Sequence, residues 1–373
     1  MLDTIILELE IDPANITDFK KFRTTKEIMQ NSQSGYDKWI NNPTKEDKKA
    51  GVYKPRLTII KRGIRFYLKI EFSAPKMLFS DNLNELGEKD FEPLLGKLNE
   101  QLQEMGVKIF SILLEQANVI SFHPSKNILL SNGYISSFAI RELSKIDISK
   151  KFDLEMVRYR NGGEAMQIYT NSHSLVFYDK INDLTKPAKR AMDKDQTPQQ
   201  VSLFAYIKKQ KKPIEILRME ARLSKRKILN EALTGLGYSK NPVFKDIFNN
   251  ALCQKILLSY WERFFSDNLF LFDVQNNPQK IFQSILEKHG QDIGVKKAIL
   301  LTGFNILCKD DEGMRGFRNI AEVYKPKTNW TKFKKWRDIF QSQITTTPLH
   351  GFIKDIEQQL KNFEPYKLPE KPK

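Results

Sequence analysis

The chain has 373 residues, of which 40% are hydrophobic and 28% charged, a composition that excludes a disordered protein and leaves room for two or three domains. Lysine and arginine outnumber aspartate and glutamate by 61 to 45, and the net charge of +16 favours a polyanionic partner, nucleic acid or an anionic membrane. The apolar runs are shorter than the ~20 residues that span a bilayer, and the first residues are acidic where a signal peptide is basic, so we expect no membrane partner.

Alternation of apolar and polar residues predicts a sheet in the first part of the chain, as in GIRFYLKIEFS and EILRMEARLSK. The predicted strands cover residues 1–11, 63–73, 117–130 (interrupted at Pro124), 165–170, 174–180 and 215–225. A Gly-Gly turn at residues 162–163 precedes two of them. Apolar residues at helical spacing predict helices at residues 81–106, 134–150, 227–237, 247–265, 279–289 and 293–308.

These elements predict an α+β protein with a largely antiparallel sheet, helices packed on one face of it, and a mainly helical C-terminal domain. We expect a catalytic sheet domain at residues 1–225 and a helical DNA-binding or accessory domain at residues 226–373, with a Pro- and Lys-rich tail that frays from about residue 365.

The two cysteines, Cys253 and Cys308, form neither a CxxC pair nor a disulfide framework, which favours a reducing, cytoplasmic location. Both lie in apolar sequence, and we predict buried thiols. The sequence has no GxxxxGK[ST], HExxH or GxSxG motif, no zinc-ligand spacing and no pair of nearby histidines.

Three predicted strands carry polar side chains that can share one face of the sheet. Glu220 alternates with Arg218 and Arg222, His123 lies on the side of its strand opposite Phe122, and Tyr178 ends an apolar run. A carboxylate, an imidazole, a phenol and nearby cations suit phosphodiester chemistry.

In that chemistry, Glu220 and His123 would hold a divalent metal, Mg²⁺ or Mn²⁺, and Tyr178 would attack phosphorus. A free tyrosine has a pKa of ~10, so the phenol needs help from the metal or from a cation such as Lys180 or Lys126. Each residue also has a structural interpretation: a packed tyrosine, a hydrogen-bonded histidine before a proline, and a carboxylate in a cross-strand ion pair.

Five blocks together resemble the phage and plasmid rolling-circle replication initiators of the gene II/gene X type, known from filamentous phages. The blocks are MLDTIIL, FSAPKMLFSDNLNEL, SKNILL, SLVFYDK and ILRMEARL, in order over residues 1 to about 225. The resemblance implies a metal-dependent enzyme of the bacterial cytoplasm that nicks and closes replication-origin DNA, both single- and double-stranded. A tyrosine is joined to the 5′ phosphate, and the free 3′ hydroxyl primes synthesis. The resemblance also implies a host helicase and polymerase as partners and no small-molecule cofactor.

Carried over by match, Tyr178 is the nucleophile, Asp179 and Lys180 are its neighbours, and Glu220 is a metal ligand. Asp179 is counted with Glu220 and His123 as a candidate metal ligand. The sequence departs from the family at Ser121-Phe122-His123, where an Arg-x-Asp pattern is expected. His123 then replaces a carboxylate, and imidazole suits Mn²⁺ better than Mg²⁺. The site is therefore either a variant metal site or an impaired one.

Residues 322–338 interleave lysines with aromatic residues, as expected where cations meet phosphates and rings stack on bases. A basic amphipathic helix with its tryptophans in the core is the alternative. A second basic cluster is KRGIR at residues 61–65, and a third is KKQKKP at residues 208–213. The predicted DNA-binding residues are Arg218, Arg222, Lys61, Arg62, Arg65, Lys325, Lys327, Trp330, Lys332, Lys334, Lys335 and Trp336.

Two other functions remain open at this point. One is a DNA-binding protein whose active site has decayed, and the other is a single-strand nucleic-acid binder without catalysis. A covalent protein–DNA adduct distinguishes the enzyme from both.

Overall fold

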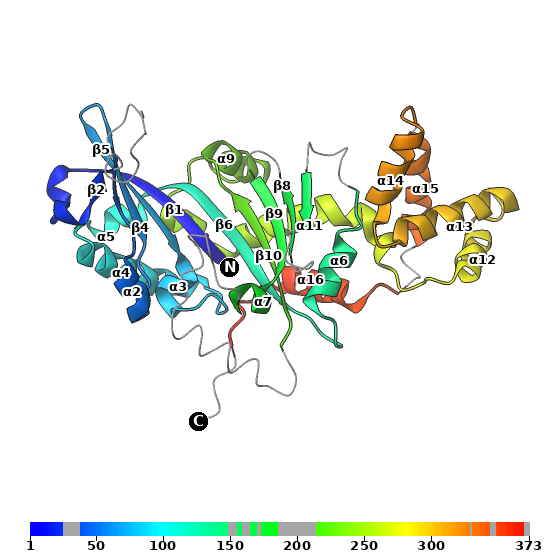
Figure 1. Ribbon diagram of the computed structural model, residues 1–373, viewed down its shortest axis with the longest axis horizontal. Coiled ribbons are helices and arrows are strands. Elements are labelled where there is room, and N and C mark those ends of the chain that lie inside the picture. Colours follow the sequence, from blue (N-terminus) through cyan, green and yellow to red (C-terminus); the bar gives the residue numbers. More distant parts are fainter. Residues whose placement is uncertain are drawn as a thin grey trace, which may run out of the picture.

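The computed structural model describes residues 1–24, 38–147, 155–158, 165–169, 173–185, 214–328, 330–343 and 348–368. The predicted turn at residues 162–163 and the basic cluster at residues 208–213 lie outside these ranges. The fold is α+β as predicted: a large antiparallel sheet with helices, followed by a mainly helical C-terminal region (Figure 1).

In the described part of the chain, ten strands form one sheet in the order β2-β3-β4-β5-β1-β6-β10-β9-β8-β7. All neighbouring strands are antiparallel. The strands are β1 (Leu2–Ile11), β2 (Arg23–Thr24), β3 (Lys38–Asn41), β4 (Arg56–Arg62), β5 (Arg65–Ser73), β6 (Asn118–Leu129), β7 (Glu155–Arg158), β8 (Ala165–Tyr169), β9 (His173–Asp179) and β10 (Ile216–Leu223).

Cross-strand pairing of buried apolar side chains sets the register at the centre of the sheet. Ile5 lies opposite Phe72 and Leu7 opposite Ile70, and all four are at most 1% exposed. Since side chains alternate along a strand, a shift of one residue would move this whole set to the polar face. The period-two pattern of the sequence therefore fixes both the strands and their pairing.

The predicted interruption of the third strand at Pro124 is wrong, because β6 runs unbroken from Asn118 to Leu129. Pro124 lies opposite Leu2, next to an irregularity in the β1–β6 register. A proline cannot donate to the sheet ladder and is tolerated at such a bulge.

Helices cover the apolar face of the sheet. The rings of Phe72 and Phe244 meet edge to face with centroids 6.0 Å apart, and those of Phe177 and Phe265 meet in the same way at 5.5 Å. The longer helices of this layer are α4 (Phe91–Glu104), α6 (Ser136–Leu143), α9 (Arg226–Gly235) and α11 (Asn250–Phe265). The sheet region also contains the short helices α2 (Lys45–Ala50), α3 (Ala74–Phe79), α5 (Ser111–Glu115), α7 (Lys180–Thr185) and α10 (Phe244–Ile247), and the 3-10 turns η1 (Pro13–Asn15), η2 (Phe19–Lys21) and η3 (Glu88–Asp90).

The C-terminal helices form the opposite end of an elongated molecule from the β4–β5 hairpin (Figure 1). They are α12 (Pro278–His289), α13 (Val295–Lys309), α14 (Gly313–Tyr324) and α15 (Trp330–Gln343), reached through the 3-10 segment η4 (Ser266–Phe272). The last helix, α16 (Gly351–Asn362), returns to pack near β6 and α11. One cluster of buried apolar residues runs through both the sheet layer and these helices, so the core is continuous across residue 225.

The segment after α16 is bound to residues 84–85, in the loop between α3 and η3. The Tyr366 amide donates to Glu85 at 2.8 Å, and the Leu368 amide donates to Asn84 at 3.0 Å. Residues 365–368, which composition assigns to a frayed tail, are therefore held in place. Cys253 and Cys308 are both buried and unpaired, as the sequence predicts. Among the described residues, no helix is long and apolar enough to cross a membrane.

Glu85 gives a direct test of how buried polar contacts with β6 stabilise the fold. Its carboxylate is 2% exposed and binds Lys126 Nζ at 2.8 Å, as well as the amides of Asn127 and Tyr366. Glu85→Ala would leave the buried Lys126 ammonium without its counter-ion, and we expect a loss of about 3–5 kcal/mol in the free energy of unfolding by urea titration.

Glu100→Ala is the matched control, because Glu100 forms an exposed ion pair with Lys97. That change should cost about 0–1 kcal/mol. Equal losses in the two variants would show that the buried Glu85–Lys126 contact does not stabilise the fold.

Candidate active site

Three neighbouring strands bring the predicted polar residues onto one face of the sheet. In the register, Arg218 of β10 lies opposite Asn127 of β6 and opposite Tyr178 of β9. Glu220 lies opposite Ser125 on β6. Directly opposed residues of antiparallel strands point to the same side, so these side chains share a face.

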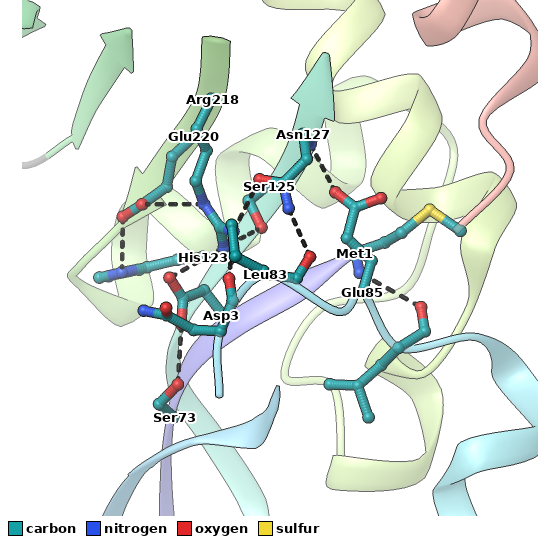
Figure 2. A network of polar contacts seen from close by, with 12 residues as sticks. Met1, Asp3, Ser73, Leu83, Glu85, His123, Ser125, Asn127, Arg218 and Glu220 are labelled. Atoms are coloured by element: carbon teal, nitrogen blue, oxygen red, sulfur yellow. Dashed lines mark hydrogen bonds and ion pairs between the residues drawn. The ribbon is translucent and has the colours of Figure 1, made fainter. Parts of the chain in front are cut away.

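Arg218 is the centre of this site, and it is 2% exposed (Figure 2). Its Nη2 donates to Asp3 Oδ2 at 2.9 Å and to Ser125 Oγ at 2.7 Å, and its Nη1 donates to Asn127 Oδ1 at 3.0 Å. Ser73 Oγ donates to the other oxygen of Asp3 at 2.9 Å. A buried guanidinium is tolerated only when it is paired and hydrogen-bonded, and these partners meet that need.

Glu220 forms the second half of the site. Tyr178 Oη donates to its Oε2 at 3.1 Å, and Arg222 Nε donates to its Oε1 at 2.7 Å. His123 Nδ1 lies 3.4 Å from Oε1, and Arg218 Nε lies 3.8 Å from Oε2. The structure thus brings together the tyrosine, the carboxylate and the imidazole that the sequence placed on one face.

The surroundings of Glu220 and Tyr178 determine the protonation state of each side chain. Burial opposes the charged form of Glu220, but Arg222 and then His123 hold its pKa well below the usual range. Burial, and next the charge of Glu220, raises the pKa of Tyr178 well above 10. At neutral pH the carboxylate is therefore ionised and the phenol keeps its proton.

Lys180 is 1% exposed, and its Nζ lies 5.7 Å from the centroid of the Tyr178 ring. Burial, and next the neighbouring Arg218, lowers the pKa of Lys180 to about 7. Asp3 partly opposes this shift, since it favours the ammonium form. Lys180 is therefore a buried amine beside the phenol that changes protonation near neutral pH.

Two other predicted site residues lie elsewhere. Asp179 is opposite Leu217, on the apolar face, and its two carboxylate oxygens accept from the Asn182 amide and side chain at 2.9 and 2.8 Å. Lys126 is opposite Met219 on that same face, and its ammonium binds Glu85. Asp179 thus organises the first turn of α7, and Lys126 belongs to a buried ion pair with Glu85.

The described residues do not fit a divalent metal in this arrangement. Within them, no group of three His, Cys, Asp or Glu side chains comes together at metal-binding spacing. Of the predicted ligands, only His123 and Glu220 are neighbours, and Glu220 is bound by Arg222 and Tyr178. Guanidinium groups at the carboxylate also oppose a second cation there.

Four residues of the site were not predicted: Asp3, Ser73, Ser125 and Asn127. Ser125 and Asn127 continue the alternation of Ser121 and His123 along β6, so the pattern contained them. Asp3 is an acidic residue near the start of β1, in an otherwise mostly apolar stretch. That position was the only feature of the sequence that could have marked it as a site residue.

The predicted DNA-binding residues fall into different environments. Arg218 is buried and forms an ion pair with Asp3, whereas the Arg222 side chain is 35% exposed. Lys61, Arg62 and Arg65 are exposed on the β4–β5 hairpin, as are Lys325, Lys327, Lys334 and Lys335 around α15. The Lys332 side chain lies outside the described part.

The tryptophans of α15 pack within the C-terminal helices. The Trp330 ring is 6.1 Å from that of Phe317, and the Trp336 ring is 5.5 Å from that of Phe304. Both tryptophans are partly buried. The helix therefore presents lysines to solvent and aromatic rings to the core.

Lys180 makes the stability of the protein depend on pH in a defined window. The folded protein releases its proton near pH 7, whereas an unfolded chain keeps it to about 10.4. The unfolded state binds more protons between these values, so the Lys180 contribution raises stability with pH, by up to about 1.4 kcal/mol per pH unit. Lys180→Met should flatten the curve of unfolding free energy between pH 7 and 9.

Lys97→Met replaces an exposed lysine of α4 and should leave the wild-type slope unchanged. Parallel curves for wild type and Lys180→Met would contradict the lowered pKa of the buried amine.

Comparison of the chain with protein-family models, with curated proteins and with solved structures finds no match.

Proposed function

We propose that this chain is a DNA nicking and closing enzyme that starts rolling-circle replication, with Tyr178 as the nucleophile. The observation that carries the proposal is the hydrogen bond from Tyr178 to Glu220 at 3.1 Å, with His123 3.4 Å from the same carboxylate. The sequence motifs shared with the gene II/gene X type of phage and plasmid initiator give the proposal its reaction and its substrate.

The contacts of Glu220 suggest how the phenol is activated. A phosphodiester entering this site attracts Arg222, the more exposed of the two guanidiniums at the carboxylate. As Arg222 turns to the phosphate, Glu220 loses the charge that chiefly lowers its pKa and becomes a stronger base. Substrate binding and activation of Tyr178 are thereby coupled.

The reaction then balances as a transesterification. The Tyr178 oxygen bonds to phosphorus as the P–O3′ bond breaks, and Glu220 carries the tyrosine proton, which ends on O3′. The products are a 5′-phosphotyrosine and a free 3′ hydroxyl. Arg222 and the Lys180 ammonium offset the charge that develops on the phosphate. In the cell, a polymerase would extend the 3′ end and a helicase would open the duplex.

Two features of the charge distribution support a DNA substrate. The net charge is +16, and exposed cations occur at both ends of the molecule, on the β4–β5 hairpin and on α15 (Figure 1). The burial of Arg218 and its hydrogen bonds to Asp3, Ser125 and Asn127 equally suit a structural network in a non-catalytic DNA-binding protein. A covalent adduct decides between these functions.

The adduct assay uses a pool of single-stranded oligonucleotides, randomised in sequence and labelled at the 3′ end, because a 5′-phosphotyrosine keeps that end on the protein. The wild type should give a labelled protein band that survives denaturation. Tyr178→Phe should abolish the band while losing only about 1 kcal/mol of stability, since one hydrogen bond is removed.

Tyr67→Phe is the matched control, because Tyr67 is a half-buried tyrosine of β5 on the same sheet. Adduct formation by Tyr178→Phe would refute the assignment of the nucleophile. The assay is run with Mg²⁺, with Mn²⁺ and with a chelator. A chelator-resistant adduct would assign phosphate neutralisation to this chain's own cations, and a chelator-sensitive one would restore the predicted metal.

The lysines and tryptophans of α15 should separate in their effects. Lys334→Ala with Lys335→Ala should reduce the slope of log affinity against log salt by about 1.8 on duplex DNA, at about 0.9 per phosphate contact. Trp336→Ala should instead cost about 3–5 kcal/mol of stability, because its ring packs on Phe304 and Phe333.

Lys97→Ala, a change on α4, is the control for loss of a surface charge. Salt-dependent affinity and thermal unfolding are measured on the same variants. An unchanged affinity and slope in the lysine variant would show that α15 is not a DNA-binding surface.

A further inference from the structure

The hairpin that joins β4 to β5 ends in an exposed apolar side chain. Arg62 pairs with Arg65, and the two residues between them, Gly63 and Ile64, make the turn. Gly63 has a φ of +64°, which favours glycine, and the Ile64 side chain is 93% exposed. In Figure 1 the hairpin is the blue loop that rises at the sheet end of the molecule.

Ile64 does not contribute to the stability of the fold in this position. The second residue of such a turn is commonly polar, and an isoleucine that is almost wholly in water buries no apolar surface. A single exposed apolar residue is ordinary on a protein surface. What sets Ile64 apart is the arrangement of charges around it.

Cations flank Ile64 on both faces of the two-stranded ribbon. Lys61 lies over the Phe66 ring, 5.7 Å from its centroid, on one face. Arg62 lies over the Tyr67 ring at 4.7 Å on the other. Arg62 and Arg65 are 46% and 63% exposed, so their charges are available at the tip.

The acidic partners of these arginines do not prevent a new contact. Arg62 pairs with Glu8 at 2.8 Å and Arg65 with Glu10 at 3.4 Å. Exposed ion pairs contribute about 0–1 kcal/mol, and a phosphate can replace the carboxylate at small cost. The pairs hold the guanidiniums near the tip until a polyanion arrives.

A ribbon with an apolar tip and cations on both faces fits the groove of a DNA duplex, where phosphates line both walls. Apolar side chains such as isoleucine insert between base pairs from a groove and unstack them. We propose that the β4–β5 hairpin enters the duplex and that Ile64 acts as a wedge that unstacks a base step. This inference rests on the proposed DNA substrate.

The hairpin and the candidate active site are connected along one face of the sheet. Arg62 and Arg65 share the sheet face of Glu8 and Lys69, and Ile6 continues that face to Ser121 on β6. His123 and Glu220 follow on the same side. A strand released at the tip can therefore run along one face of the sheet to Tyr178.

The test uses a 30-base-pair duplex with 2-aminopurine at a central TA step, because this base brightens when it is unstacked. The wild type should raise its fluorescence. Ile64→Ser should abolish the rise and weaken duplex binding about tenfold, and Ile64→Phe should restore both. Ile299→Ser removes an apolar side chain of α13 that is 58% exposed and should change neither.

The single-strand adduct assay separates this inference from the proposed function. Ile64→Ser should form the tyrosine adduct as wild type does, because a single strand needs no unstacking. Tyr178→Phe should lose the adduct and keep the fluorescence rise. A fluorescence rise and duplex affinity in Ile64→Ser equal to those of wild type would overturn the wedge, whether or not the adduct forms.

Discussion

The buried guanidinium of Arg218 is the constraint on which the rest of the site depends. An unpaired charge at this depth would cost several kcal/mol, so the chain must supply Asp3, Ser125 and Asn127 around it. Those partners come from β1 and β6, and they keep both strands in register with β10. Glu220 is ordered by the same network, and Tyr178 is ordered through Glu220.

The alternation rule predicted most of the sheet and the core of the site. Spacing within each strand allowed Tyr178, His123 and Glu220 to share one face, and the structure brings them together. The same rule misplaced Ile64. Alternation assigned this residue to a strand, but it lies in the turn between β4 and β5, where Gly63 has a positive φ. Period alone cannot locate a turn inside a run that alternates throughout.

Other misses have a different physical origin. Asp179 follows Tyr178 directly, so strand geometry sends it to the opposite face, and its prediction as a metal ligand went against that geometry. The pairing of Arg218 with Asp3 spans 215 residues, and no local pattern encodes such a contact. The sequence left two interpretations of Trp330 and Trp336 open, stacking on bases or packing in the core, and their packing depends on residues of α13 and α14 that lie outside the segment itself.

The strand order has a consequence for how the protein is made. β1 leaves the ribosome first, yet β6, one of its two neighbours, and β10, the next strand beyond, emerge far later. Contacts of such high sequence separation form slowly, because closing the long intervening loop costs conformational entropy before the contacts can stabilise the fold. A nascent chain that ends before Arg218 would hold Asp3 without its cation and Tyr178 without the carboxylate of Glu220. Any activity of this site therefore has to await synthesis of β10, so a chain that stops short of this strand lacks the complete site.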